Sequence, residues 1–230
     1  MIYISKLFSP ISTDTSAGDI DVGATVKINE DGQPVDYLVV HQGLPSDIYD
    51  ASCEGTWCLR KDIAENRQWN SSNVNDYANS TINAYLNGDW LNRYDPEMAE
   101  AIKQVKIPYR QNGGSGGTDQ TGSSGLSCKV FLLSGYEVGW TTSDSQYFPN
   151  DGAKLSYFLD GTGSSANSKR VAKLNGSATG WWLRSPYTHS TSSVRLVRSG
   201  GDYGDWGANN SYGVRPVFIL PYSFKFKEVS

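Results

Sequence analysis

Between residues 187 and 212 the sequence gathers side chains whose chemistry suits molecular recognition. Rigid aromatic rings stand among hydrogen-bonding groups and glycines, a composition that antibody-like binding loops share. Tyrosine, tryptophan and arginine also contribute much of the binding energy in protein interfaces. On this basis the candidate ligand contacts are Tyr187, His189, Ser190, Ser193, Arg195, Arg198, Asp202, Tyr203, Asp205, Trp206, Asn209 and Tyr212.

We expect the aromatic side chains of this set to anchor a ligand by surface complementarity, and the charged ones to set the polarity and register of the complex. A solvated, glycine-rich surface loop without a ligand would have a similar composition. Loops on a rigid scaffold commonly carry function, and this segment holds several large aromatic residues. Binding is therefore the interpretation that we prefer.

Catalytic and metal chemistry have few candidate residues. The chain has 2 histidines, His41 and His189, and neither stands in a motif typical of a nucleophilic triad. There is no phosphate-binding Gly-Lys-Ser/Thr loop and no His-Glu-x-x-His motif. Cys53 and Cys58 lack the second pair that a structural zinc site needs, and no carboxylate cluster completes a calcium site. We therefore expect no enzyme activity, no cofactor and no metal.

Charge and hydropathy exclude two classes of partner. The net charge of the 230 residues is −4 and the pI is about 5.2, whereas nucleic-acid-binding domains commonly have a basic patch or a pI above about 9. No apolar run approaches the roughly 20 residues that span a bilayer, and the first residues do not resemble a signal peptide. We therefore expect no nucleic-acid binding, no membrane insertion, and synthesis in the cytoplasm. Reduced cysteines fit that compartment better than a Cys53–Cys58 bridge, and both states stay open.

The elements that must position the candidate contacts are short. Residues 24–28 and 35–40 alternate around a turn and predict a hairpin. Apolar spacing predicts a helix over 74–91, and Asp95 followed by Pro96 predicts the start of a second helix. Further strands are predicted at 56–60, 129–133, 154–159, 170–174, 181–186, 194–198 and 214–220.

These elements indicate an α+β fold with two helices, short antiparallel strands and long loops. We expect an N-terminal arm over residues 1–23 and a single domain over 24–230. Within that domain, the Gly, Ser and Thr stretch 111–127 is predicted to be a flexible surface loop. The C-terminal hairpin segment 180–220 would carry the binding face.

Several residues of that hairpin segment are expected to have structural roles. Trp181 and Trp182 point to opposite faces of one strand and should both be buried. Arg184 and Arg215 lie within apolar strands, where they should bind carbonyls or carboxylates. Apolar residues do not alternate cleanly over 194–198, so Arg195 and a second arginine three residues later should straddle a β-bulge.

Two segments carry a family resemblance, Gly180-Trp-Trp-Leu-Arg-Ser-Pro186 and Asn210-Ser-Tyr-Gly-Val-Arg-Pro-Val217. The pair resembles the same segments in domains with a C-type-lectin-like fold of the formylglycine-generating-enzyme type. Such domains occur in phage, prophage and bacterial proteins and include DUF6273-like domains. With weaker similarity upstream, the resemblance covers roughly residues 24–221 and implies a C-type-lectin-like fold. It does not extend to catalysis, because the oxidases need a cysteine pair in the C-terminal half and only Cys128 lies beyond residue 60.

Some variable proteins of diversity-generating retroelements have this fold, and adenine-directed mutagenesis randomises their C-terminal segment. Residues 187–212 are rich in amino acids that an Asn codon reaches by adenine substitution, although Trp206 is not one of them. The resemblance thus implies a phage or prophage virion-associated variable protein. Its binding face would recognise a host cell-surface protein or glycan.

Under that interpretation the arm, residues 1–23, would attach to a neighbouring virion protein, and we expect a homo-oligomer. Two alternatives remain. The chain could be a structural virion subunit, for head decoration or the tail, without a dedicated ligand. It could also be a carbohydrate-binding module whose tryptophan and tyrosine faces stack on sugars.

Overall fold

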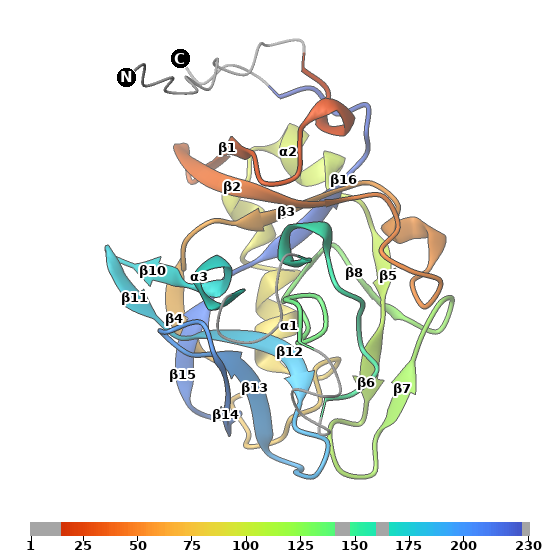
Figure 1. Cartoon of the computed structure of the whole chain (residues 1–230), viewed down its shortest axis with the longest axis vertical. Coiled ribbons are helices and arrows are strands. Elements are labelled where there is room, and N and C mark those ends of the chain that lie inside the picture. The colour runs from red at the N-terminus through yellow and green to blue at the C-terminus, as the bar shows by residue number, and fades with distance from the viewer. Residues whose placement is uncertain (1–14, 141–147, 160–165, 227–230) are drawn as a thin grey trace, which may run out of the picture.

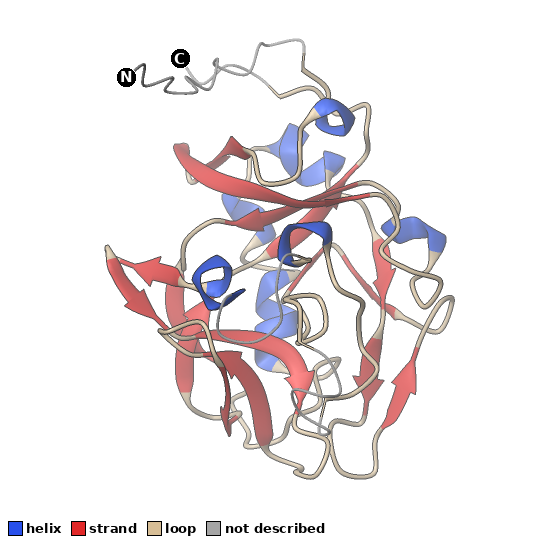
Figure 2. Ribbon diagram, in the orientation of Figure 1, coloured by secondary structure: helices blue, strands red, loops and turns tan. Residues whose placement is uncertain are grey.

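The computed structural model describes residues 15–140, 148–159 and 166–226. Within these ranges the chain folds mainly into β-strands, which form two five-stranded and three two-stranded sheets. Figure 1 shows the two larger sheets in the upper and lower halves of the molecule. Figure 2 shows that short helical turns are distributed around them.

The first large sheet is antiparallel and has the order β1-β2-β3-β16-β9. Its strands are β1 (Thr25–Glu30), β2 (Gln33–Gln42), β3 (Thr56–Arg60), β9 (Val130–Phe131) and β16 (Val217–Leu220). The β1–β2 turn lies at Asp31 and Gly32, whose φ angles of 52° and 73° suit an Asp-Gly hairpin turn. The predicted hairpin is confirmed.

The second large sheet carries the candidate contacts and has the order β14-β13-β12-β15-β4. Its neighbours pair antiparallel, except for β12 and β15, which are parallel. Its strands are β4 (Glu65–Gln68), β12 (Trp181–Pro186), β13 (Ser193–Val197), β14 (Tyr203–Gly207) and β15 (Ser211–Val214).

The closing strand predicted over 214–220 is divided between the two large sheets. β15 ends at Val214 and β16 begins at Val217, with Arg215 and Pro216 between them. Proline has no N–H to donate to a strand ladder, and the Pro216 carbonyl accepts a bond of 2.9 Å from the Arg60 N–H. The crossing at Pro216 therefore ties the sheet of the candidate contacts to the first sheet.

Smaller elements complete the described structure. Three two-stranded sheets pair β5 with β8, β6 with β7 and β10 with β11. These strands are β5 (Val105–Ile107), β6 (Tyr109–Gln111), β7 (Thr118–Gln120), β8 (Leu126–Cys128), β10 (Ala172–Leu174) and β11 (Ser177–Thr179). The helices are α1 (Thr81–Leu86), α2 (Pro96–Ala101) and α3 (Asn167–Arg170), and the 3-10 turns are η1 (Ala17–Asp19), η2 (Ala51–Cys53), η3 (Leu91–Arg93) and η4 (Ser156–Phe158).

The expectation of an α+β, C-type-lectin-like fold with two helices is wrong, because the described chain is mostly β-sheet. The helix expected over 74–91 is reduced to the six residues of α1. It begins where the Ser80 hydroxyl accepts the Asn83 N–H at 3.2 Å. Residues before Ser80 are held instead by other segments, as when the Asn75 N–H donates to the Thr191 carbonyl at 3.0 Å. Asp95 and Pro96 do begin α2, but it also has only six residues.

Three other segments differ from the expectation. The stretch 111–127, expected to be a flexible loop, includes β7 and the first residues of β8. The strand expected over 154–159 is the turn η4, and that over 170–174 contains the end of α3 followed by β10. Short segments of this kind take their structure from tertiary contacts more than from local propensity.

The described part of the predicted arm packs against the end of the chain. Ala17 is fully buried, its N–H donates to the Phe224 carbonyl at 2.8 Å, and the Gly18 N–H donates to the Tyr222 carbonyl at 3.0 Å. Ile20 is also buried. Residues 1–14 of the arm lie outside the described residues.

The core contains five fully buried tryptophans, two of which belong to β12. Trp181 donates its indole N–H to the Arg170 carbonyl at 2.9 Å, and Trp182 donates to the Arg67 carbonyl at 3.0 Å. Their predicted structural role is confirmed. Among the described residues, no helix has the length and apolar character needed to cross a membrane.

Candidate functional site

Seven of the twelve candidate contacts lie on the regular β13–β14 hairpin, which forms one edge of the second sheet (Figure 1). Tyr187, His189 and Ser190 precede this hairpin, Asn209 follows it, and Tyr212 belongs to β15. β13 and β14 pair continuously from Ser193 opposite Gly207 to Val197 opposite Tyr203. The bulge expected between the two arginines is therefore absent from this pair. The register shift lies instead between β12 and β13, in the stretch from Trp182 to Pro186.

The most exposed aromatic side chains of the hairpin belong to β14. Trp206 is 53% exposed and Tyr203 is 38% exposed. Because side chains alternate along a strand, these two rings lie on opposite faces of the sheet. The Tyr203 ring meets Trp140 edge-on at 5.7 Å and Phe148 at 6.3 Å. Tyr203 is thus held in place, while Trp206 stands out from the surface.

Arg195 supports this surface from below rather than forming part of it. It is 3% exposed, and its guanidinium lies 4.7 Å from the Phe148 ring centre and 4.4 Å from that of Tyr187. Its Nη1 lies 3.5 Å from Oδ1 of Asp205, an exposed carboxylate on β14. Burial lowers the Arg195 pKa, and the Asp205 charge opposes that effect. Arg195 is therefore not an exposed ligand contact, and it holds the side chains of Tyr187 and Asp205 in place.

The remaining candidates divide between exposed and structural positions. His189 and Asn209 are exposed, and Arg198 forms an exposed ion pair of 3.1 Å with Asp202. Such a pair adds little stability, so both groups can exchange it for a ligand. The other three are partly buried and serve the hairpin itself: Ser190 accepts the N–H groups of residues 192 and 193, Ser193 begins β13, and Tyr212 lies edge-on to Trp182 at 5.0 Å.

A residue that the sequence did not reveal, Asn75, holds the loop that precedes β13. Its buried side chain donates to the carbonyls of Ser190 at 2.9 Å and Ser193 at 2.7 Å. Its side-chain oxygen accepts the Gly114 N–H at 2.9 Å, and its own N–H donates to the Thr191 carbonyl at 3.0 Å. Asn75 therefore joins three segments that are distant in sequence.

Gly114 approaches the same loop too closely for any other residue. A Cβ atom built there would lie 2.1 Å from the Tyr187 carbonyl oxygen and 2.2 Å from that of Ser190. The neighbouring Ser115 N–H donates to the Ser190 carbonyl at 2.9 Å. The glycine-rich stretch thus packs closely against the loop that precedes β13, and these contacts explain why it is ordered.

Replacing Asn75 with alanine is expected to lower the free energy of unfolding by about 2 kcal/mol, because three hydrogen bonds are lost and their partners stay buried. Amide hydrogen exchange should accelerate at Gly114. Denaturant unfolding and exchange measured by NMR test this. The exposed neighbour Asn73 is the matched control, and Asn73→Ala should change stability by less than about 0.5 kcal/mol. Equal effects from the two substitutions would remove the special role of Asn75.

The closest arrangement to a catalytic pair is that of His41 and Ser156. Nδ1 of His41 lies 2.8 Å from the Ser156 hydroxyl oxygen and accepts the Ser156 N–H at 3.2 Å. Burial lowers the His41 pKa and favours the neutral ring that can accept these bonds. The contact caps the start of η4. Within the described ranges, no group of three His, Cys, Asp or Glu side chains could hold a metal ion, and Cys53, Cys58 and Cys128 are buried free thiols.

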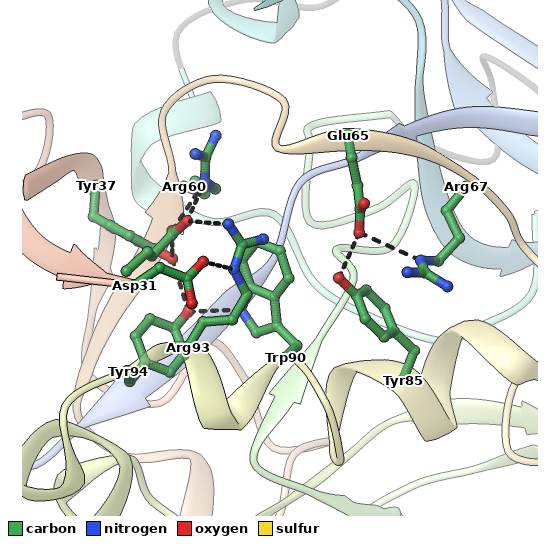
Figure 3. A network of polar contacts seen from close by, with 10 residues as sticks. Asp31, Tyr37, Arg60, Glu65, Arg67, Tyr85, Trp90, Arg93 and Tyr94 are labelled. Atoms are coloured by element: carbon green, nitrogen blue, oxygen red, sulfur yellow. Dashed lines mark hydrogen bonds and ion pairs between the residues drawn. The ribbon is translucent and has the colours of Figure 1, made fainter. Parts of the chain in front are cut away.

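A buried carboxylate network lies in the first sheet (Figure 3). Glu30 accepts the Tyr37 hydroxyl at 2.5 Å and Nε of Arg60 at 2.9 Å. The Tyr37 and Tyr94 hydroxyl oxygens lie 2.7 Å apart, and the Trp90 indole donates to Tyr94 at 2.9 Å. Burial raises the Tyr37 pKa well above its usual value. These groups satisfy one another and bind η3 to the sheet.

A second group of polar contacts in Figure 3, around Glu65, joins α1 to the second large sheet. The Tyr85 hydroxyl donates to Glu65 of β4 at 2.5 Å, and the Arg67 guanidinium lies 3.5 Å from the Tyr85 ring centre. Since Arg67 pairs with Tyr212 of β15, these contacts fasten α1 to the edge of the sheet opposite β14.

The predicted structural role of Arg184 is confirmed by a fully buried ion pair at the centre of the molecule. Its two Nη atoms lie 2.6 Å from the two carboxylate oxygens of Glu137, and Nη1 also donates to the Leu132 carbonyl. Arg215 behaves in the same way, since its Nε donates to the Arg60 carbonyl at 2.8 Å. Burial lowers the Arg215 pKa to about 10.

Beside this pair lies the fully buried carboxyl of Asp151, whose main-chain carbonyl accepts a bond from Arg184. Neither of its carboxyl oxygens has hydrogen-bonding geometry with a described group. Burial raises the Asp151 pKa to about 7, although the Arg184 charge and the nearby Ser185 hydroxyl oppose the rise. This carboxyl titrates near neutrality at the centre of the fold.

The model of a family described as a domain of unknown function, DUF6273, matches residues 54–222. This range contains every strand of the second sheet and excludes β1 and β2. No curated protein and no solved structure matches the chain.

Proposed function

The chain belongs to the DUF6273 family, and from its own surface we propose that it is a non-enzymatic recognition protein. Residues 187–212 form its ligand-binding face, with the exposed side chains of β14 at the centre. The single observation that carries this proposal is the pair of exposed rings, Tyr203 and Trp206, on a strand that pairs with β13 over its whole length. Exposed aromatics of this kind are typical anchors of protein interfaces.

The support beneath the face favours recognition over a passive surface. Asn75 and Gly114 hold the preceding loop, and Arg195 is stacked between two rings below Asp205. A face that is ordered before it meets a ligand loses less conformational entropy on binding. The charges at the surface are paired, so aromatic contact and hydrogen bonding are the main sources of affinity.

We further propose that the ligand is a host-surface receptor and that the protein is a virion-associated variable protein. The support is the resemblance of segments 180–186 and 210–217 to those of such proteins, together with the composition of residues 187–212. The flanking DNA tests this directly. We expect a near-copy of the codons for residues 180–220, differing only at adenines, beside a reverse transcriptase gene. If no such copy exists, the variable-protein proposal fails.

Combining Trp206→Ala with Arg198→Ala is expected to weaken binding of the labelled protein to receptor-bearing bacterial cells by about tenfold or more. The melting temperature should change by no more than about 2 °C, because both side chains are exposed. Flow cytometry and differential scanning calorimetry measure the two effects. Leu159, which is 56% exposed and lies outside the hairpin, provides the control variant Leu159→Ser.

A large fall in melting temperature would assign Trp206 and Arg198 to the structure instead of the ligand. If the double variant and Leu159→Ser bind cells equally well, the proposed face is wrong.

A further inference from the structure

We propose that the free edge of β14 binds an extended segment of a partner protein as an added antiparallel or parallel strand. The inference rests on the proposed function and specifies its ligand as a polypeptide. It follows from the backbone of the strand as well as from its side chains.

β14 is the outermost strand of its sheet. β13 pairs with one side of it, and no described strand pairs with the other. Bonds from the Arg198 N–H to the Asp202 carbonyl, 2.8 Å, and from the Ala208 N–H to the Ser192 carbonyl, 2.8 Å, close the hairpin at its two ends. They also fix which residues face β13.

In an antiparallel pair, alternate residues exchange both of their backbone bonds with the partner. The two closing bonds place Gly204 and Trp206 among the residues bonded to β13. Tyr203 and Asp205 alternate with these residues, so their backbone N–H and C=O groups point away from β13. Among the described residues, no backbone or side-chain group binds these four atoms.

The open stretch has defined ends. Before it, Nε of Arg170 donates to the Gly201 carbonyl at 2.9 Å. After it, the Asn210 N–H donates to the Gly207 carbonyl at 3.0 Å. The edge available to a partner therefore runs from Tyr203 to the Gly207 N–H of β14, which is within the usual range of strand lengths.

The spacing of the unpaired groups selects a polypeptide over a glycan. Tyr203 and Asp205 each present one donor and one acceptor in the plane of the sheet, about 7 Å apart along the strand. An extended peptide repeats the same donor and acceptor pattern at the same interval, and a sugar does not. Strand addition of this kind obtains affinity from main-chain bonds and specificity from side chains.

The side chains beside the edge indicate the character of the incoming strand. Tyr203 and Trp206 offer one aromatic ring on each face of the sheet. The Asp205 carboxylate is offset by Arg195 at 3.5 Å, and β14 has neither the lysine nor the proline that commonly protects an edge. The partner strand is thus expected to be uncharged, with large apolar residues that contact the two rings.

The test uses a displayed library of random ten-residue peptides, selected on the full-length protein. We expect enrichment of uncharged peptides rich in β-branched and aromatic residues. On addition of a synthetic enriched peptide, amide exchange should slow by about tenfold or more at Tyr203 and Asp205. It should change little at Gly204 and Trp206, which already bond to β13. Failure to enrich any peptide, or protection without this alternation, would overturn the proposal.

A matched pair of variants tests the same edge in a second way. Asp205→Pro removes an outward N–H without removing a bond to β13, a position where an edge strand accepts proline. Asp205→Ala removes the same carboxylate but keeps the N–H. Peptide binding by Asp205→Pro should be about tenfold or more weaker than by Asp205→Ala. Equal binding by the two variants would overturn the proposal, and the exchange pattern of the unmodified protein decides the matter if Asp205→Pro does not fold.

Cell binding separates this inference from the proposed function. If Trp206→Ala with Arg198→Ala abolishes cell binding but Asp205→Pro and Asp205→Ala bind alike, the face is correct and strand addition is wrong. If none of the variants affects cell binding, the proposed face itself fails. Light scattering of the unmodified protein and of Asp205→Pro measures their oligomeric states. If the unmodified protein is a dimer and Asp205→Pro is a monomer, the edge binds a second copy of this chain and the proposed partner is wrong.

Discussion

Replacing Glu137 with glutamine is expected to lower the free energy of unfolding by about 3–5 kcal/mol, because removal of one partner leaves the Arg184 charge buried without compensation. Both side chains of the pair are fully buried, and each carboxylate oxygen lies 2.6 Å from a guanidinium nitrogen. Glu137 also accepts the Tyr49 hydroxyl at 2.7 Å and the Ser134 N–H at 2.8 Å. Glutamine cannot accept all of these bonds at once.

Denaturant unfolding of the purified protein measures this effect. Glu100 is exposed, so Glu100→Gln is the matched control and should change stability by less than about 0.5 kcal/mol. The Arg184 guanidinium also donates to the carbonyls of Pro108 and Leu132. We therefore expect the loss of the Glu137 carboxylate to weaken these contacts as well. A Glu137→Gln variant as stable as the control would show that the pair contributes nothing to the fold.

Replacing Asp151 with asparagine is expected to abolish a fall in stability that the unmodified protein undergoes as the pH rises towards neutrality. The Asp151 pKa rises from 3.8 to about 7 on folding because the carboxyl is buried. The folded state then binds the proton more tightly than the unfolded state. The contribution of this group to the free energy of unfolding therefore decreases as the pH rises from about 4 to about 7, and is constant above that range.

The size of the effect follows from the shift. One unit of pKa corresponds to about 1.4 kcal/mol, so this carboxyl alone should remove on the order of 4 kcal/mol between pH 4 and pH 8. Unfolding free energies of Asp151→Asn and the unmodified protein, measured in urea at several pH values, should diverge over this interval. The exposed Asp47 supplies the control variant Asp47→Asn, which should follow the unmodified protein. Parallel curves for Asp151→Asn and the unmodified protein would contradict the proposed titration.

The sequence predicts best those features whose cause is local. The Asp31-Gly32 hairpin turn, the start of α2 at Asp95 and Pro96, and the burial of Trp181 and Trp182 are all found in the structure. Each depends on the residue itself or on its immediate neighbours. The helix expected over 74–91 fails for the opposite reason. Its first residues are held by bonds to segments more than thirty positions away, such as the bond that the Gly114 N–H donates to the Asn75 side-chain oxygen.

The exposure of residues in the proposed binding face was predictable in outline and not in detail. Composition selected the correct hairpin for exposed aromatics, since Tyr203 and Trp206 are exposed. Composition could not show that Arg195 is buried, because its burial depends on Phe148, which is remote in sequence. Asn75 was missed because it follows a run of similar polar residues, and only the carbonyls that converge on it distinguish it.

The way in which residues 187–193 are held has a consequence for how the sequence of this loop can change. Asn75, Gly114 and Ser115 contact the peptide carbonyls of this loop. Every amino acid has the same carbonyl, so these anchors do not depend on which side chains the loop displays. A gene could rewrite the exposed positions of the loop and keep its shape, because the residues that give that shape are encoded elsewhere. The residues that hold the loop and the side chains that the loop displays can therefore change independently of each other.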